Sequence, residues 1–172
     1  SVKDAVGVKN LSSIIHQQHG QLIVVVSAMG KTTNLLETLC NAYFHQDPKA
    51  TAIMKELKNF HLDIVNTLFP LNAPVYKHLE ELFTNLENIL TSESSLCYDY
   101  EYDRIICFGE LISTTIISDY LKMEGIENQF IDIRKFLKTD QNYRNANIDL
   151  ELSEQLCKET FDFKASSIFL SL

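Results

Sequence analysis

Two short stretches of the sequence carry residues that could bind a small charged molecule. In VVVSAMGKTTNLLE, Ser27 follows an apolar, strand-like run, and Thr32 and Thr33 stand where a helix would begin. In CFGELIS, the carboxylate of Glu110 follows Gly109 within an otherwise apolar segment. Hydroxyl and free N–H groups at a helix start bind carboxylates or phosphates, whereas a carboxylate binds an ammonium group. The two stretches together predict a site for a small zwitterion.

The Gly30-Lys31-Thr32 triplet resembles the end of a nucleotide-binding P-loop, but its context excludes that motif. A P-loop has a further glycine five positions before the Gly-Lys pair, so that backbone N–H groups can surround the phosphates. Val25 occupies that position here, inside the apolar run. The turn from Ser27 to Gly30 is therefore too short to hold a triphosphate, and we interpret it as a different kind of loop.

Each candidate also has a purely structural interpretation. Thr33 or Asn34 could simply cap the following helix. Glu110 could form an internal salt bridge with Arg104 or Arg134, because a carboxylate buried without a partner costs several kcal/mol. Gly109 beside it would let a ligand or another backbone segment approach closely. The sequence leaves both interpretations open.

Other polar residues are weaker candidates for chemistry. Three acids crowd the beginning of a predicted helix, where negative charges usually complement the helix dipole: Asp99, Glu101 and Asp103. His16 and His19 have a spacing that could hold a metal, but a third ligand is not near them in sequence, so we expect a solvated helix end and no metal site. Asp132 and Arg134 follow a predicted strand and could contact a ligand or brace the neighbouring loop.

The composition is typical of a globular protein. The 172 residues suffice for one domain with a core, and 45% of them are hydrophobic. A net charge of −8 argues against a nucleic-acid groove and against anionic membranes. The cysteines are widely spaced, which predicts reduced thiols that are buried as small hydrophobic groups. Because the sequence contains neither a membrane-length apolar run nor a signal-peptide pattern, we expect a cytoplasmic protein.

The elements that must position these residues alternate between helix and strand. Helical spacing covers 3–19, ending at Gly20, and then 34–44, a hairpin at about 50–92, 98–123 and 149–158, whereas strand patterns cover 21–26, 129–133 and 166–170. Strand 21–26 is apolar at successive positions, as in a central parallel strand that is covered on both faces. Asn34 and Glu37 have capping-box spacing. This order predicts an α/β fold with a mainly parallel sheet.

The same segments resemble the aspartate kinase family. Ser1-Val2 is similar to the end of the family's KFGGTSV element, and VVVSAMGKTTNLL to its second strand and loop. The long helical hairpin, FGELIS, FIDIRKFLKTD and YRNANID then follow in the family's order. The resemblance covers nearly the whole chain. It implies the three-layer α/β/α sandwich of the amino-acid kinase fold, with this chain as its N-terminal, substrate-side half.

The resemblance also implies a reaction and roles for residues. The family transfers the γ-phosphoryl group of ATP to the side-chain carboxylate of L-aspartate, with Mg²⁺, at the start of lysine, threonine and methionine synthesis. By position, Ser27 and Thr33 would contact aspartate near its reactive carboxylate, and Glu110 would bind its α-amino group. The resemblance further implies that the full-length protein is a homo-oligomer, and it leaves open whether that protein is fused to homoserine dehydrogenase.

The sequence departs from the family pattern in what it lacks. The catalytic lysine of the family would precede Ser1, and Lys31 leaves a different strand. The nucleotide-binding half and the regulatory ACT domains would follow Leu172. We therefore expect 1–172 to be a partial catalytic domain that neither binds ATP and Mg²⁺ nor turns over by itself.

Two alternatives compete with this interpretation. A relative of the same fold could act on glutamate or acetylglutamate, although the long hairpin before Gly109 speaks against it. A non-catalytic binding module could also have kept the fold.

Overall fold

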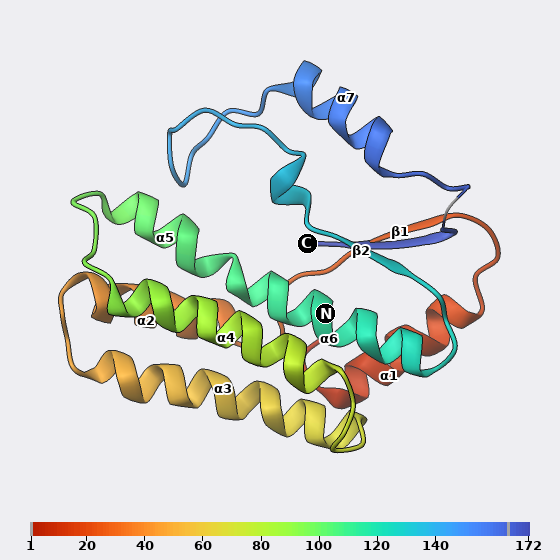
Figure 1. The fold of residues 1–172 in the computed structure, drawn as a ribbon, viewed down its shortest axis with the longest axis horizontal. Coiled ribbons are helices and arrows are strands. Elements are labelled where there is room, and N and C mark those ends of the chain that lie inside the picture. The colour runs from red at the N-terminus through yellow and green to blue at the C-terminus, as the bar shows by residue number, and fades with distance from the viewer. Residues whose placement is uncertain (1, 165) are drawn as a thin grey trace.

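A computed structural model describes residues 2–164 and 166–172, so that Ser1 lies outside the described residues. The helices are α1 (Ala5–His16), α2 (Thr32–Phe44), α3 (Lys49–Leu68), α4 (Val75–Thr91), α5 (Tyr98–Ile106), α6 (Phe108–Met123) and α7 (Leu150–Thr160). The strands are β1 (Leu22–Val25), β2 (Gln129–Ile131) and β3 (Ile168–Ser171), and a short 3₁₀ helix, η1 (Ile133–Lys135), follows β2. The helix and strand order of the sequence prediction is thus confirmed, and Figure 1 shows the arrangement.

The three strands form a parallel sheet in the order β1-β3-β2. On one face, Val24 and Phe130 flank Leu170, which is fully buried in a core shared with α6. On the other face, the buried ring of Phe169 meets the rings of Phe161 and Phe163, which follow α7, at 5.3 and 5.1 Å between centroids. The sheet therefore has packing on both sides, as in an α/β sandwich.

The expectation that the first strand is central and covered on both faces is wrong for the described residues. β1 is an edge strand, because only β3 pairs with it. Its inward side chains are partly buried, whereas Ile23 and Val25 on the outward face are 49% and 75% exposed. The apolar run marks a strand correctly, but it does not show how much of the outward face is covered.

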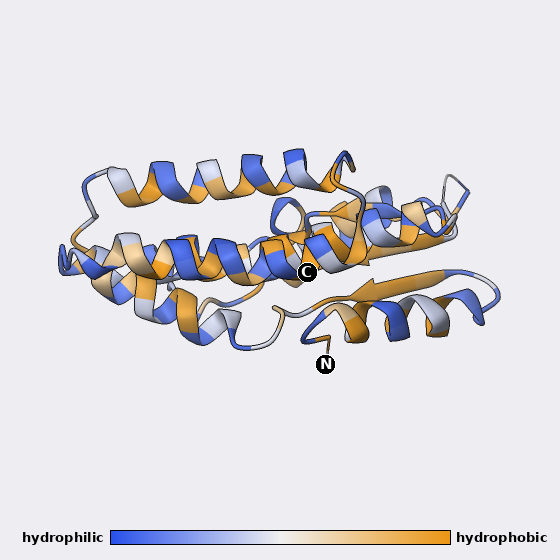
Figure 2. Cartoon of the chain, turned by 90° about the horizontal axis from the view of Figure 1, so that it is seen from below, coloured by the Kyte–Doolittle hydropathy of each residue, from blue (hydrophilic) through white to orange (hydrophobic). Residues whose placement is uncertain are grey.

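The predicted helical hairpin is present as α3 and α4, which run side by side in opposite directions (Figure 1). Pro70 and Pro74 lie in the connection, and Pro74 directly precedes α4. Figure 2 shows apolar residues concentrated on the inward faces of these helices. Side chains such as Leu57 on α3 and Leu79 on α4 are completely buried there, so that the hairpin shares the core of the sheet and α6.

The expected single helix from Tyr98 to Met123 is instead two helices that meet at Cys107. The backbone of Cys107 stays in the right-handed helical region, with φ −58° and ψ −17°. The apolar periodicity therefore continues across the junction, with Ile105 and Phe108 both buried. A period-based prediction cannot detect such a break, because the inward face is unchanged.

The predictions for the helix starts have mixed outcomes. Asp149 caps α7 as expected, since its carboxylate accepts a hydrogen bond from Leu152 N at 3.0 Å. The capping box of Asn34 and Glu37 is wrong, because α2 begins at Thr32 and Lys31 provides no side-chain cap.

Among the described helices, none has the length and apolarity needed to cross a membrane.

Candidate substrate-binding site

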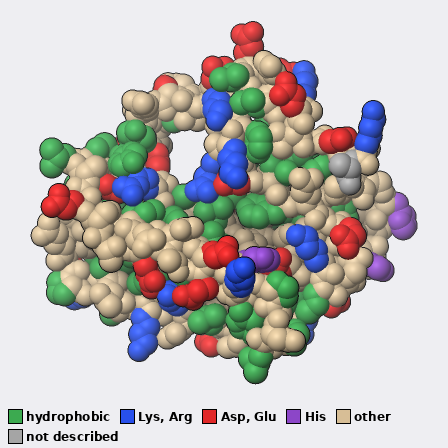
Figure 3. Space-filling view, viewed as in Figure 1, with side chains coloured by type: hydrophobic (Ala, Val, Ile, Leu, Met, Phe, Trp, Pro, Cys, Tyr) green, Lys and Arg blue, Asp and Glu red, His purple; other side chains and the backbone are tan. Residues whose placement is uncertain are grey.

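The candidate site lies at the carboxyl edge of the sheet. Because the strands are parallel, the chain leaves β1 at Val26-Ser27 and leaves β2 at Asp132 along this same edge. Val26 N extends the pairing by donating to Ser171 O at 2.8 Å. Figure 3 shows a hollow between α5 and the segment after η1, bordered by both basic and acidic side chains. Ligands of open parallel sheets bind at such an edge.

The loop after β1 is fastened to the start of α6. Ser113 donates its hydroxyl hydrogen to Ser27 O at 2.8 Å, and Ala28 N–H donates to one carboxylate oxygen of Glu110 at 3.3 Å. Gly109 makes this approach possible, because a Cβ atom at that position would lie 2.9 Å from Ala28 Cβ. The structure thus brings the Ser27 loop and Glu110 together, although they are far apart in the sequence.

Glu110 is half-buried in the first turn of α6, where the helix dipole favours a negative charge. The expected alternative, a salt bridge to Arg104 or Arg134, is wrong. Arg104 pairs with Glu101 at 2.9 Å, and Arg134 pairs with Asp132 at 2.8 Å. Within the described residues, the second carboxylate oxygen of Glu110 has no hydrogen-bond partner, so it could accept a hydrogen bond from an ammonium group.

The start of α2 differs from the expectation that Thr33 or Asn34 caps it. Neither side chain caps the helix, and Thr33 is half-buried without a side-chain hydrogen bond to any described residue. Thr32 is only 2% exposed, and its hydroxyl lies 3.3 Å from His61 Nε2. The first-turn N–H groups of α2 are therefore not occupied by the side chain of Lys31. Sequence reasoning missed His61, which stands within an apolar helical pattern.

The turn between the strand and α2 is shaped by packing. Met29 is completely buried, and Gly30 has a φ of +56°, which non-glycine residues rarely adopt. A Cβ atom on Gly30 would lie 3.0 Å from Phe60 Cζ and 3.3 Å from Lys3 O. The turn is thus enclosed between α1 and α3, which explains why a glycine precedes the lysine without a P-loop.

Asp132 and Arg134 pair with each other, which supports the bracing interpretation more than direct contact with a ligand. Arg134 Nε and Nη2 donate to the two carboxylate oxygens of Asp132 at 2.9 and 2.8 Å. These hydrogen bonds lower the pKa of Asp132. Arg134 Nη1 also donates to Cys107 Sγ at 3.1 Å, which ties the end of β2 to the junction of α5 and α6. Burial still raises the pKa of the Cys107 thiol, so the thiol stays protonated.

The acids at the start of α5 hold neighbouring segments in place. Glu101 is completely buried and accepts a hydrogen bond from Ser95 N at 2.7 Å. Asp103 accepts a hydrogen bond from Arg144 N at 2.9 Å, and Asp99 pairs with the guanidinium of Arg144 at 3.2 Å. These contacts fasten the turn-rich segment before α7 onto α5. The cluster therefore has a structural role.

The cysteines and histidines are the remaining candidates for thiol chemistry or metal binding. Among the described residues, the thiols are free, and no group of three or more His, Cys, Asp or Glu side chains could hold a metal ion. The expectation that all the cysteines are buried is wrong, because Cys97 is exposed whereas Cys40 is buried.

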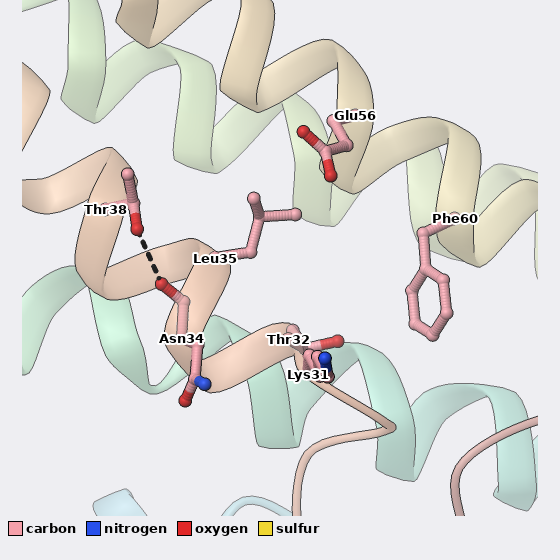
Figure 4. A pocket seen from close by; sticks show the side chains of 7 residues that line it. All are labelled: Lys31, Thr32, Asn34, Leu35, Thr38, Glu56 and Phe60. Atoms are coloured by element: carbon pink, nitrogen blue, oxygen red, sulfur yellow. Dashed lines mark hydrogen bonds between the residues drawn. The ribbon is translucent and has the colours of Figure 1, made fainter.

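A pocket of about 270 Å³ adjoins the start of α2, on the side that faces α3 (Figure 4). It is lined by Lys31, Thr32, Asn34, Leu35, Thr38, Glu56 and Phe60. Thr38 donates its hydroxyl hydrogen to Asn34 O, so that this hydroxyl is already bound within α2. The pocket therefore lies between α2 and α3, with Thr32 in its lining and the Thr38 hydroxyl not available to a ligand.

The chain is similar in sequence to aspartokinases of several organisms. No model of a protein family matches the chain. The chain is 27% identical over 129 residues to an aspartokinase of Chlamydia pneumoniae, covering 75% of this chain and 27% of the relative. It is 29% identical over 157 residues to the chloroplastic aspartokinase 2 of Arabidopsis thaliana, covering 86% and 28%. It is also 24% identical over 119 residues to the bifunctional aspartokinase/homoserine dehydrogenase 2 of Escherichia coli, covering 69% and 15%.

Solved structures show the same fold. The crystal structure of E. coli aspartokinase III in complex with lysine and aspartate matches with a TM-score of 0.87 at 20% identity, over 99% of this chain and 38% of that one. The structure of the same enzyme with aspartate and ADP matches with a TM-score of 0.86 at 21% identity. The described residues thus have an aspartokinase fold, and the chain spans between about a quarter and two fifths of the length of these proteins, or less for the bifunctional relative.

Proposed function

We propose that this chain is part of an aspartate kinase and that it supplies the site for L-aspartate. The reaction would transfer the γ-phosphoryl group of ATP to the side-chain carboxylate and yield 4-phospho-L-aspartate. One observation carries the proposal: Ala28 N–H binds Glu110, which places the Ser27 loop beside a carboxylate with a free oxygen, in a chain that is similar to aspartokinases throughout. The E. coli aspartokinase III of similar fold was crystallised in complex with aspartate, which supports the same ligand for this chain.

The three candidate residues would divide the recognition of aspartate. Glu110 would accept a hydrogen bond from the α-ammonium group through the carboxylate oxygen that Ala28 leaves free. Ser27, whose side chain is exposed, and Thr33 would donate hydroxyl hydrogens to a substrate carboxylate. Uncapped N–H groups in the first turn of α2 would add positive potential for the same carboxylate. This arrangement would orient the substrate, and orientation is a large part of catalysis in phosphoryl transfer.

ATP and Mg²⁺ would supply the phosphoryl group and neutralise its charge. The described residues do not fit a magnesium site of their own, because no cluster of three or more suitable ligands is present among them and Asp132 is engaged by Arg134. We therefore propose that these groups bind to other parts of a longer protein. We also propose that the 172-residue chain alone is inactive.

The assembly and place of action are further proposals. We infer a homo-oligomeric cytoplasmic enzyme, in keeping with the family resemblance. A fusion to homoserine dehydrogenase is supported by one relative, whose name describes such a bifunctional protein.

The test is the substrate range of the longer natural protein that contains this chain. We expect ADP release that depends on L-aspartate, together with an acyl phosphate that hydroxylamine traps as aspartyl hydroxamate. Glutamate and N-acetylglutamate should not support turnover. If either of them replaces aspartate, the enzyme is a different amino-acid kinase; if none supports ADP release, the binding-module interpretation prevails. Aspartate-dependent ADP release by the 172-residue chain would refute its proposed inactivity.

A further inference from the structure

We propose that His61, on helix α3 of the hairpin, is a positioning residue for the substrate loop, because it binds the hydroxyl of Thr32 at the start of α2. His61 does not touch the proposed aspartate site. The inference rests on the proposed function and extends it, since it assigns the long hairpin a part in substrate binding.

The hydrogen bonds of His61 define its protonation. The imidazole is completely buried, and Nδ1 lies 2.9 Å from Leu57 O, one helical turn earlier. Because a carbonyl oxygen only accepts hydrogen bonds, Nδ1 carries the proton. Burial lowers the pKa of His61 to about 4, so the ring is neutral at physiological pH. Nε2 is therefore an acceptor, and the Thr32 hydroxyl donates to it across 3.3 Å.

This hydrogen bond directs the hydroxyl of Thr32 away from its own helix. Capping is the role of the N-cap position, which Lys31 occupies here without a side-chain cap. Thr32, the first residue of α2, is 2% exposed, and its hydroxyl is directed to His61 on α3. Thr32 N–H donates to Met29 O at 3.0 Å, whereas no side chain of a described residue caps the N–H groups of Thr33 and Asn34, so these two groups could bind a ligand carboxylate.

Thr32 also touches the other half of the site. A Cβ atom on Gly109 would lie 3.4 Å from Thr32 Cγ2 and 2.9 Å from Ala28 Cβ. The methyl group of Thr32 therefore packs beside the start of α6, next to Glu110. A shift of Thr32 would move both the start of α2 and the surface on which the Ser27 loop rests.

The neighbour of His61 supports the same loop. The Phe60 ring lies against Gly30, and it meets the imidazole edge-on with 5.0 Å between centroids. Figure 4 shows Phe60 and Thr32 at the pocket between α2 and α3. The hydrogen bond between His61 and Thr32 therefore links the hairpin directly to the loop beside this pocket.

Three variants of the longer natural protein test the inference. His61→Phe keeps an aromatic ring but removes the acceptor, His61→Gln retains an acceptor near the Nε2 position, and Thr32→Val removes the donor with little change in shape. The control is Leu79→Ala, which weakens the hairpin at a fully buried position on α4. For each folded protein, we would measure the Kd of L-aspartate calorimetrically, the KM for aspartate and for ATP, and the melting temperature.

We expect His61→Phe and Thr32→Val each to raise the Kd and KM for aspartate by roughly 2- to 12-fold, as the loss of one neutral hydrogen bond would. The KM for ATP should stay constant. The double variant should be no worse than either single variant, and His61→Gln should recover part of the affinity. Leu79→Ala should lower the melting temperature without this change in aspartate binding.

Two results would overturn the inference. One is a set of His61 and Thr32 variants that lose stability but bind aspartate as the wild type does. The other is additivity of the two single substitutions in the Kd. If the wild type itself binds no aspartate, the proposed function fails first, and the inference falls with it.

Discussion

Replacing Glu110 with glutamine removes a charge while preserving the local geometry. A glutamine oxygen can still accept the hydrogen bond that Ala28 N–H now makes at 3.3 Å, so the Ser27 loop should stay in place. What is lost is the negative charge that faces the substrate ammonium. A hydrogen bond to a charged group contributes about 1.5–3 kcal/mol, so the KM for aspartate should rise roughly 10- to 150-fold.

Steady-state kinetics on the longer natural protein would measure this effect. The KM for ATP should remain within about 2-fold of the wild type, because the contact is made only with aspartate. Glu124→Gln makes the same charge change at an exposed position at the other end of α6 and should leave both constants unchanged. An unaltered aspartate KM in a folded Glu110→Gln enzyme would refute the role of Glu110 in substrate binding.

Three further predictions concern packing and charge. Gly109→Ala places a methyl group 2.9 Å from Ala28 Cβ, so it should weaken aspartate binding, as calorimetry would show; an unchanged Kd would contradict the close packing. The pKa of His61 in the folded protein is about 4, below its ordinary value of 6.5. As the pH falls, the His61 imidazole is therefore protonated in the unfolded chain before it is protonated in the folded protein. The free energy of unfolding should therefore be unaffected by protonation of His61 above pH 6.5 and should decline by about 3 kcal/mol toward pH 4. Urea unfolding at several pH values should show a smaller decline in the His61→Phe variant. Glu101→Ala leaves Arg104 without its partner and should cost about 2–4 kcal/mol in the same assay, in contrast to an exposed pair.

Local signals in the sequence were sufficient for much of the architecture. Alternating strands and helices indicated the parallel sheet, and the prolines at 70 and 74 separated the hairpin helices. Ser27 was a candidate because it follows a strand and precedes a helix start, and the Gly109-Glu110 pair because a glycine and an acid are costly in an apolar helix. The structure brings these two stretches together through the Ala28–Glu110 hydrogen bond.

The features that were missed depend on contacts between distant segments. The capping predictions failed at α2 because the helix begins at Thr32, which places Thr33 and Asn34 inside it, and the sequence did not show that Thr32 contacts His61, 29 residues away. The break at Cys107 leaves the apolar period intact, and the edge position of β1 depends on which strand pairs with it. Composition and spacing indicate which segments form helices or strands and which of their faces are buried. The three features above depend instead on contacts with residues that are distant in the sequence.

The most direct test of the central claim is the position of L-aspartate in an experimental structure of the longer natural protein. We predict that its α-nitrogen lies within about 3 Å of a Glu110 carboxylate oxygen, a normal hydrogen-bond distance, with a substrate carboxylate facing Ser27 and the start of α2. Aspartate bound elsewhere, with Glu110 remote from its ammonium group, would contradict the account.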